Sequence, residues 1–267
     1  MALIQGDFYS TALAKLTNYY LVLPNDVFPG MIEGNKHYSR NMKTLYLLHG
    51  YSGSARDWLL GSRAQELAIQ YNLAIAMPTG DNSFYLDRKG TGRAYCQHVG
   101  KEFIDYTRKT YGLSDRREDT YIGGNSMGGF GAIHTGLTFP ETFQSILALS
   151  SALIIHDIKN QPEDFTNAIA DYEYYSTVFG DLKLLEHSEN NPEQLVRRLK
   201  EEGKEIPAIY MACGTEDFLL EQNRSFHTFL EKEQALVTYQ EGPGVHDWSF
   251  WNEYLEKGIE WFLEAEQ

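Results

Sequence analysis

The stretch TYIGGNSMGGFGA, residues 120–132, decides how the rest of the sequence is interpreted. It contains the pattern Gly-x-Ser-x-Gly, formed by Gly124, Ser126 and Gly128. An apolar run rich in β-forming residues precedes the serine, and a run rich in small residues, 126–140, follows it and stops at a proline. This context predicts a buried strand, a tight turn at the serine, and a helix.

The predicted turn gives the serine a chemical role. A serine on so tight a turn has strained backbone, and its neighbours two positions away approach other backbone, so both must be nearly free of side chain. The helix that begins there directs free N–H groups and its positive dipole end at a developing anion. We therefore interpret Ser126 as a nucleophile. The alternative is a glycine-rich turn in which the serine only caps the helix.

Strands alternate with helices along the chain. We expect strands at 16–24, 44–50, 73–78, 119–124, 143–151, 207–214 and 236–241, and helices at 57–71, 93–112, 126–140, 221–234 and 247–265. This alternation predicts an α/β fold in which a mostly parallel central sheet has helices on both faces. The first strand is expected to form a hairpin with the residues before it.

Residues 156–206 interrupt this alternation with a polar segment that has only weak helical patterns. We interpret the segment as a small, lid-like helical insertion in a single domain, 1–267. Open α/β sheets bind ligands at the carboxyl ends of their strands, and we expect the insertion to lie over those ends.

A nucleophilic serine needs a histidine base, and His246 is the candidate that fits. In this architecture the acid and then the histidine follow the serine along the chain. His134 lies too far along the helix that begins at Ser126, roughly 12 Å at the rise of an α-helix. His246 lies in the loop GPGVHDW, between the last strand and the terminal helix. The other histidines precede the serine or lie in the insertion or inside a helix: His37, His49, His98, His156, His187 and His227.

The acid is expected on a loop after a strand between the serine and His246. Strand 207–214 leads directly into Glu216 and Asp217. We favour Asp217, whose side chain is short and lies further past the strand end, and Glu216 is the alternative. Asp247 is discounted because adjacent side chains rarely converge in the first turn of a helix. An acid here fixes the imidazole tautomer and stabilises the imidazolium.

Two backbone N–H groups are the expected oxyanion hole. One belongs to Met127, the residue after the nucleophile, and the other to Tyr51, in the loop that follows strand 44–50. Each such donor lowers a barrier by roughly 3 kcal/mol. We interpret His49, just before this loop, as a structural histidine.

Three aromatic residues follow strand ends near the predicted site. These are Trp58, Phe84 and Tyr85, and we expect them to wall a substrate pocket, with ordinary core packing as the alternative.

Composition excludes several functions. The chain has 267 residues, with 23 Lys+Arg against 37 Asp+Glu, a net charge of −14. Such an acidic protein repels nucleic acid and anionic membranes. The longest apolar run, 146–155, is well short of the ~20 residues that a membrane helix needs. The N-terminus lacks the pattern of a signal peptide, and the cysteines, Cys96 and Cys213, are too few for a disulfide framework. We expect a cytoplasmic protein with reduced cysteines.

Four segments together resemble the esterase D-related α/β-hydrolases, most closely the bacterial tributyrin esterases. They are LLHGYSGSARDW (47–58), MPTGDNSFYLD (77–87), YIGGNSMGGFGA (121–132) and CGTEDFLLEQNRSF (213–226). The resemblance covers nearly the whole chain. It implies the α/β-hydrolase fold and a serine carboxylesterase that hydrolyses short-chain acyl esters through an acyl-enzyme, with no metal or cofactor.

The same resemblance maps a catalytic triad onto Ser126, Asp217 and His246, and oxyanion donors onto Tyr51 and Met127. It also suggests a dimer or tetramer that acts on a small-molecule ester. Related enzymes that hydrolyse S-formylglutathione have a more polar loop after the third strand, where this chain has His49-Gly50-Tyr51. The open alternatives are a thioesterase or acyltransferase such as S-formylglutathione hydrolase, an acetyl-xylan or feruloyl-type esterase, and a non-catalytic binding protein.

Overall fold

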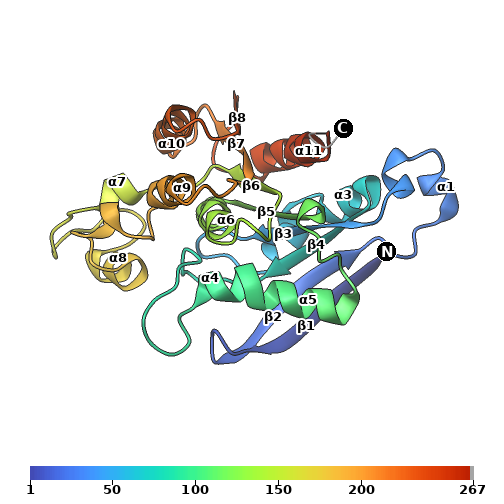
Figure 1. Ribbon diagram of the computed structural model, residues 1–267, viewed down its shortest axis with the longest axis horizontal. Coiled ribbons are helices and arrows are strands. Elements are labelled where there is room, and N and C mark those ends of the chain that lie inside the picture. Colours follow the sequence, from blue (N-terminus) through green and yellow to red (C-terminus); the bar gives the residue numbers. More distant parts are fainter. Residues whose placement is uncertain (265–267) are drawn as a thin grey trace.

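One eight-stranded sheet forms the centre of the computed structural model, which describes residues 1–264. Figure 1 shows it running across the molecule between two layers of helices. Its strands, in chain order, are β1 Ala2–Ser10, β2 Lys15–Leu23, β3 Lys43–Leu48, β4 Leu73–Pro78, β5 Thr120–Asn125, β6 Ser145–Leu149, β7 Ala208–Gly214 and β8 Val237–Gly242.

The strand order is β1-β2-β4-β3-β5-β6-β7-β8. The hairpin β1–β2 and the pair β2–β4 are antiparallel, and every other pair is parallel. All residues of β3, β4, β5 and β6 are buried, as expected for parallel strands covered on both faces. The predicted α/β-hydrolase fold, with its mostly parallel sheet, is therefore confirmed.

Helices cover both faces of the sheet. The α-helices are α1 Pro29–Ile32, α2 Asp57–Gly61, α3 Ala64–Tyr71, α4 Tyr95–Gln97, α5 Phe103–Tyr111, α6 Met127–Thr138, α7 Ile155–Ile158, α8 Tyr172–Phe179, α9 Pro192–Glu201, α10 Leu220–Lys232 and α11 Trp248–Glu264. Apolar residues of α3 and α11 pack in one core cluster, and those of α5, α6, α9 and α10 pack in the other. These two clusters lie on opposite faces of the sheet (Figure 1).

Two predicted helices are interrupted. The helix expected at 57–71 is split at Ser62, whose backbone is extended and whose hydroxyl accepts a hydrogen bond from the N–H of Ala64, the first residue of α3. The helix expected at 93–112 contains a π-helical turn, His98–Glu102, and ends at Gly112 with a φ of 66°. The last residue of the predicted terminal helix, 265, lies outside the described residues.

The insertion 156–206 contains helices α8 and α9 and most of α7. Figure 1 shows these helices grouped at one end of the molecule, beside α6, and α9 packs directly against α6. None of the helices in residues 1–264 is both long and apolar enough to cross a membrane.

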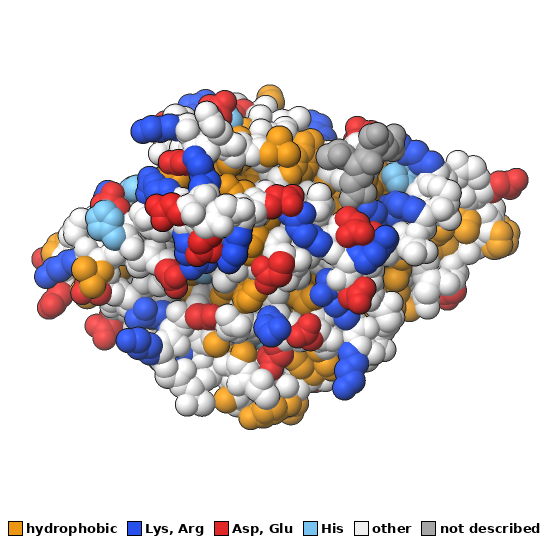
Figure 2. Space-filling view, viewed as in Figure 1, with side chains coloured by type: hydrophobic (Ala, Val, Ile, Leu, Met, Phe, Trp, Pro, Cys, Tyr) orange, Lys and Arg blue, Asp and Glu red, His pale blue; other side chains and the backbone are white. Residues whose placement is uncertain are grey.

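The acidic net charge is not gathered into one patch on the face that Figure 2 presents. Acidic and basic side chains are interspersed there, with apolar side chains between them (Figure 2).

Close backbone approach fixes the turn between β5 and α6. A Cβ atom on Gly128 would lie 2.1 Å from the carbonyl oxygen of Leu48 in β3, and one on Gly124 would lie 2.3 Å from the carbonyl oxygen of Gly128. Real Cβ atoms do not approach backbone so closely, and neither neighbour is the end of a flexible side chain. Both glycines of the motif are therefore required by sterics.

We predict that Gly128→Ala lowers the free energy of unfolding by about 2–4 kcal/mol, because the new methyl group must push α6 away from β3. Chemical denaturation monitored by circular dichroism measures this loss. Gly30→Ala is the matched control: its Cβ meets only the exposed ring of Phe28. A loss for Gly128→Ala as small as that of the control would contradict the steric account.

Candidate active site

Ser126 lies at the turn between β5 and α6 in a backbone conformation that L-residues rarely adopt, with φ 55° and ψ −120°. Its N–H donates to the carbonyl oxygen of Leu149 at 2.9 Å, and its own carbonyl accepts from Ala152 at 3.0 Å and Phe130 at 3.1 Å. Three backbone hydrogen bonds to β6, to the segment after β6 and to α6 thus stabilise the strained residue. Strain maintained in this way is typical of functional sites.

Asp217 and His246 meet although they lie on different loops. Asp217 follows β7 and His246 follows β8, and these parallel strands are neighbours in the sheet. Nδ1 of His246 lies 2.8 Å from Oδ2 of Asp217. With a carboxylate as acceptor, Nδ1 carries the hydrogen, and Nε2 is left with a lone pair that can take a proton.

The Asp217 carboxylate is buried and well supplied with donors. Its side chain is 0% exposed, while that of His246 is 18% exposed. Oδ1 accepts a hydrogen bond of 2.9 Å from the N–H of Leu219. Burial raises the pKa of this carboxyl, but the hydrogen bonds from His246 and Leu219 outweigh burial, and the pKa of Asp217 is lower than its ordinary value. The group is thus ionised at neutral pH and can stabilise an imidazolium.

The two other acids considered from the sequence have different roles. Glu216 is exposed, and its carboxylate accepts a 2.7 Å hydrogen bond from the N–H of Gly244, in the loop that carries His246. Asp247 accepts a 3.1 Å hydrogen bond from the N–H of Phe250, in the first turn of α11. Glu216 therefore ties two loops together, and Asp247 caps a helix.

A cavity of about 200 Å³ opens beside Ser126. Met127 and Tyr51, the predicted oxyanion donors, line it, and so does Phe84, one of the three predicted pocket residues. The other lining residues, which sequence reasoning did not single out, are Ala152, Ile154, Asp157, Ile158, Asn167, Ile169, Tyr175, Phe218, Leu219 and Gln222. Several come from the insertion, and their only signal in the sequence is the position of that segment after β6.

The prediction that Trp58 and Tyr85 wall the pocket is wrong, because both side chains are fully buried in the core and do not line the cavity. The indole N–H of Trp58 donates to the carbonyl oxygen of Leu48 at 2.9 Å, and its ring packs against Trp248. The hydroxyl of Tyr85 donates to the carbonyl oxygen of His49 at 2.9 Å. Each aromatic side chain thus turns inward to bond a backbone carbonyl at the carboxyl end of β3.

The loop after β3, which carries Tyr51, passes close to Ser126. A Cβ atom on Gly50 would lie 3.4 Å from the Cβ of Ser126, which shows how closely the two segments approach. Within residues 1–264, neither the N–H of Tyr51 nor that of Met127 donates to a protein acceptor. Both donors are thus available to a ligand in the cavity.

His49 has a structural role, as expected. Its Nε2 accepts from the N–H of Gly80 at 2.9 Å, so Nδ1 carries the hydrogen and donates to the carbonyl oxygen of Gly50 at 2.8 Å. Burial lowers the pKa of His49 and favours this neutral form.

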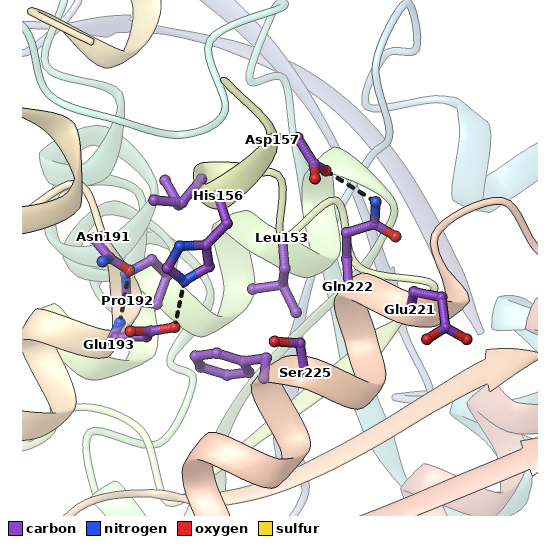
Figure 3. Close-up of a pocket in the computed structure, with 11 residues that line it drawn as sticks. Leu153, His156, Asp157, Asn191, Pro192, Glu193, Glu221, Gln222 and Ser225 are labelled. Carbon is purple, nitrogen blue, oxygen red and sulfur yellow. Dashed lines mark hydrogen bonds and ion pairs between the residues drawn. The ribbon is translucent and has the colours of Figure 1, made fainter. Parts of the chain in front are cut away.

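A second cavity, of about 160 Å³, lies on the other side of Asp157 and Gln222, which line both cavities. Figure 3 shows Nε2 of Gln222 bonded to the Asp157 carboxylate at 2.9 Å, and His156 bonded to Glu193 at 2.8 Å. The rest of the lining is Leu153, Ile155, Asn191, Pro192, Glu221, Ser225 and Phe226. The cavity therefore combines apolar surface with carboxylates, a hydroxyl and amides.

The fold and this arrangement define an α/β-hydrolase of the serine hydrolase type. The family model for a putative esterase matches residues 10–262, and the chain belongs to that family. It is therefore a hydrolase of the carboxylesterase type.

Individual relatives agree with this assignment. The chain is similar to an acetyl esterase of Caldicellulosiruptor saccharolyticus, 47% identical over 265 residues and 99% of both sequences. Among solved structures, it is similar to the substrate-bound fluorophosphonate-binding serine hydrolase FphF of Staphylococcus aureus, 26% identical with a TM-score of 0.82 over 98% of both chains. It is also similar to an S-formylglutathione hydrolase of the same organism, 25% identical with a TM-score of 0.81 over 98% of both chains.

We predict that Asp217→Asn lowers kcat for ester hydrolysis by about 10³–10⁴-fold, because an amide in this position favours the wrong imidazole tautomer. Steady-state kinetics with p-nitrophenyl acetate measures the loss. In the control, Glu216→Gln, the amide oxygen can still accept from Gly244, and kcat is expected to stay within about threefold of wild type. The opposite ranking of the two variants would identify Glu216 as the acid.

Proposed function

We propose that this protein is a serine carboxylesterase that hydrolyses short-chain acyl esters through an acyl-enzyme on Ser126. The observation that carries the proposal is the hydrogen bond between His246 and Asp217, on the loops that follow β7 and β8. The ring of Phe218 links this pair to Ser126, because it lines the cavity of Ser126 and lies 4.6 Å from the imidazole of His246.

In the proposed mechanism, the hydroxyl oxygen of Ser126 attacks the ester carbonyl carbon while Nε2 of His246 takes the hydroxyl proton. The carbonyl oxygen becomes an oxyanion and accepts hydrogen bonds from the N–H groups of Met127 and Tyr51. The C–O bond to the alcohol then breaks, and His246 returns the proton to the leaving oxygen. Water, deprotonated by the same imidazole, attacks the acyl-enzyme and releases the acid.

The cavity beside Ser126 supports a small, uncharged acyl group. Its lining is mainly apolar, with Phe84, Ile154, Ile158 and Leu219 among its residues. A volume of about 200 Å³ suits an acyl chain of a few carbons. The similarity to an acetyl esterase supports the same choice.

The second cavity favours an ester of a neutral, hydroxyl-bearing alcohol. Carboxylates accept hydrogen bonds but cannot donate them, so Asp157, Glu193 and Glu221 suit a partner with several O–H groups. Leu153 and Phe226 add apolar surface for C–H groups. The same carboxylates repel an anion, and glutathione is one. We therefore favour esters of sugars or glycerol, as in acetyl-xylan-type esterases, over S-formylglutathione.

We predict that Ser126→Ala lowers kcat for p-nitrophenyl butyrate by about 10⁴-fold or more and leaves the fold intact, because the acyl-enzyme cannot form. The variant also loses labelling by a fluorophosphonate probe. Ser39→Ala, at an exposed serine far from Ser126 in the sequence, is the control and keeps both properties. Hydrolysis by Ser126→Ala near the wild-type rate would overturn the proposal.

We predict that Ser225→Trp lowers kcat/KM for a monoacetylated sugar by about tenfold and changes that for p-nitrophenyl acetate little, because the indole fills only the second cavity. Thr228→Trp places the same side chain on an exposed position of α10 that does not line that cavity, and it serves as the control. Equal losses for both esters, or a wild-type rate on the sugar ester, would contradict the assignment of the alcohol. Preferential hydrolysis of S-formylglutathione by the wild type would favour the thioesterase alternative.

A further inference from the structure

The imidazole of His246 contacts two aromatic rings. Phe218 lies 4.6 Å from it, and Trp251, in α11, meets it edge to face at 5.0 Å with an interplanar angle of 88°. Phe218 is 66% exposed, whereas Trp251 is 7% exposed. The ring held by the core is therefore that of Trp251.

A hydrogen bond fixes the plane of Trp251. Its indole N–H donates to the hydroxyl oxygen of Ser150 at 3.0 Å. Ser150 is fully buried just after β6, has a φ of 45°, and donates its N–H to the carbonyl oxygen of Ala212 in β7 at 2.8 Å. The acceptor of the indole is therefore part of the sheet and not of a loose loop.

An indole N–H can only donate, so Trp251 takes up a lone pair of the Ser150 oxygen. The ring that contacts the imidazole is thus held by a buried hydroxyl at the end of β6.

We propose that Trp251 and Ser150 are positioning residues that orient His246 for proton transfer: the indole ring contacts the imidazole, and the indole–hydroxyl hydrogen bond to Ser150 fixes the plane of that ring. This inference rests on the proposed function of His246 as the base. It assigns no contact with substrate to either residue.

Simple core packing is the competing explanation for Trp251, and the chain offers a matched control for it. Trp248 lies on the same helix, packs against Trp251 at 5.1 Å and against Trp58 at 5.1 Å, and makes no ring contact with His246. In residues 1–264 its indole N–H donates to no protein acceptor, unlike that of Trp251. Trp248→Phe therefore removes the same atoms as Trp251→Phe from the same aromatic group.

We predict that Trp251→Phe lowers kcat for p-nitrophenyl acetate about tenfold with KM unchanged, because a misoriented base affects proton transfer and not substrate binding. Trp248→Phe is expected to stay within about twofold of wild-type kcat, even if its thermal unfolding midpoint falls as far as that of Trp251→Phe. Ser150→Ala is expected to lose about as much kcat as Trp251→Phe, and the double variant no more than either, because the residues act as a unit.

The result that would overturn the inference is a wild-type kcat in Trp251→Phe and Ser150→Ala, a loss that falls on KM instead of kcat, or equal losses in Trp251→Phe and Trp248→Phe. If Trp251→Phe fails to fold, Ser150→Ala alone decides. His246→Ala separates this inference from the proposed function. An inactive His246→Ala beside a fully active Trp251→Phe rejects only the positioning role, whereas an active His246→Ala rejects the proposed base.

Discussion

The close approach of α6 to β3 is the constraint on which the site depends. It exists only because Gly124 and Gly128 carry no Cβ atom to meet the carbonyl oxygens of Gly128 and Leu48. With these backbones in contact, the residue between the glycines takes a left-handed conformation, and its hydroxyl reaches the cavity at the end of the strands. In the proposed mechanism, the N–H of Met127 in the same turn donates to the developing oxyanion. The proposed nucleophile and one of its proposed donors thus depend on a single steric requirement.

The second half of the site depends on the parallel order of β6, β7 and β8. Their carboxyl ends lie together, so Asp217 and His246 meet although they follow different strands, and Ser150, after β6, accepts from the Trp251 ring that contacts His246. The antiparallel hairpin β1–β2 lies at the far edge of this sheet and takes no part in this arrangement. Long-range topology therefore assembles the proposed proton-transfer groups, whereas the spacing of Gly124 and Gly128 marks the turn at Ser126 in the local sequence.

This difference explains how much could be predicted from the sequence. The fold and the strand ends were predictable because the spacing of apolar residues, the spacing of glycines and the order of strands and helices can all be read directly from the sequence. Trp58 and Tyr85 were placed correctly along the chain but not in space, because their direction is set by the carbonyls of Leu48 and His49 to which they donate.

Contacts made only in three dimensions left no signal in the sequence. The bond between Asp157 and Gln222 and the bond between Trp251 and Ser150 each join positions far apart in the sequence. The break at Ser62 was not predicted either. The hydroxyl of Ser62 takes the place of a backbone carbonyl as the acceptor for the N–H of Ala64 at the start of α3.

The central claim, a covalent acyl-enzyme on the strained serine, is tested most directly by trapping that intermediate. The wild-type protein is mixed with p-nitrophenyl butyrate, quenched in acid during turnover, digested and analysed by tandem mass spectrometry. The account predicts a butyryl group on the peptide that contains Ser126, at the hydroxyl of that residue. A butyryl group on another residue, or turnover with no covalent adduct at any time before substrate is exhausted, would contradict it.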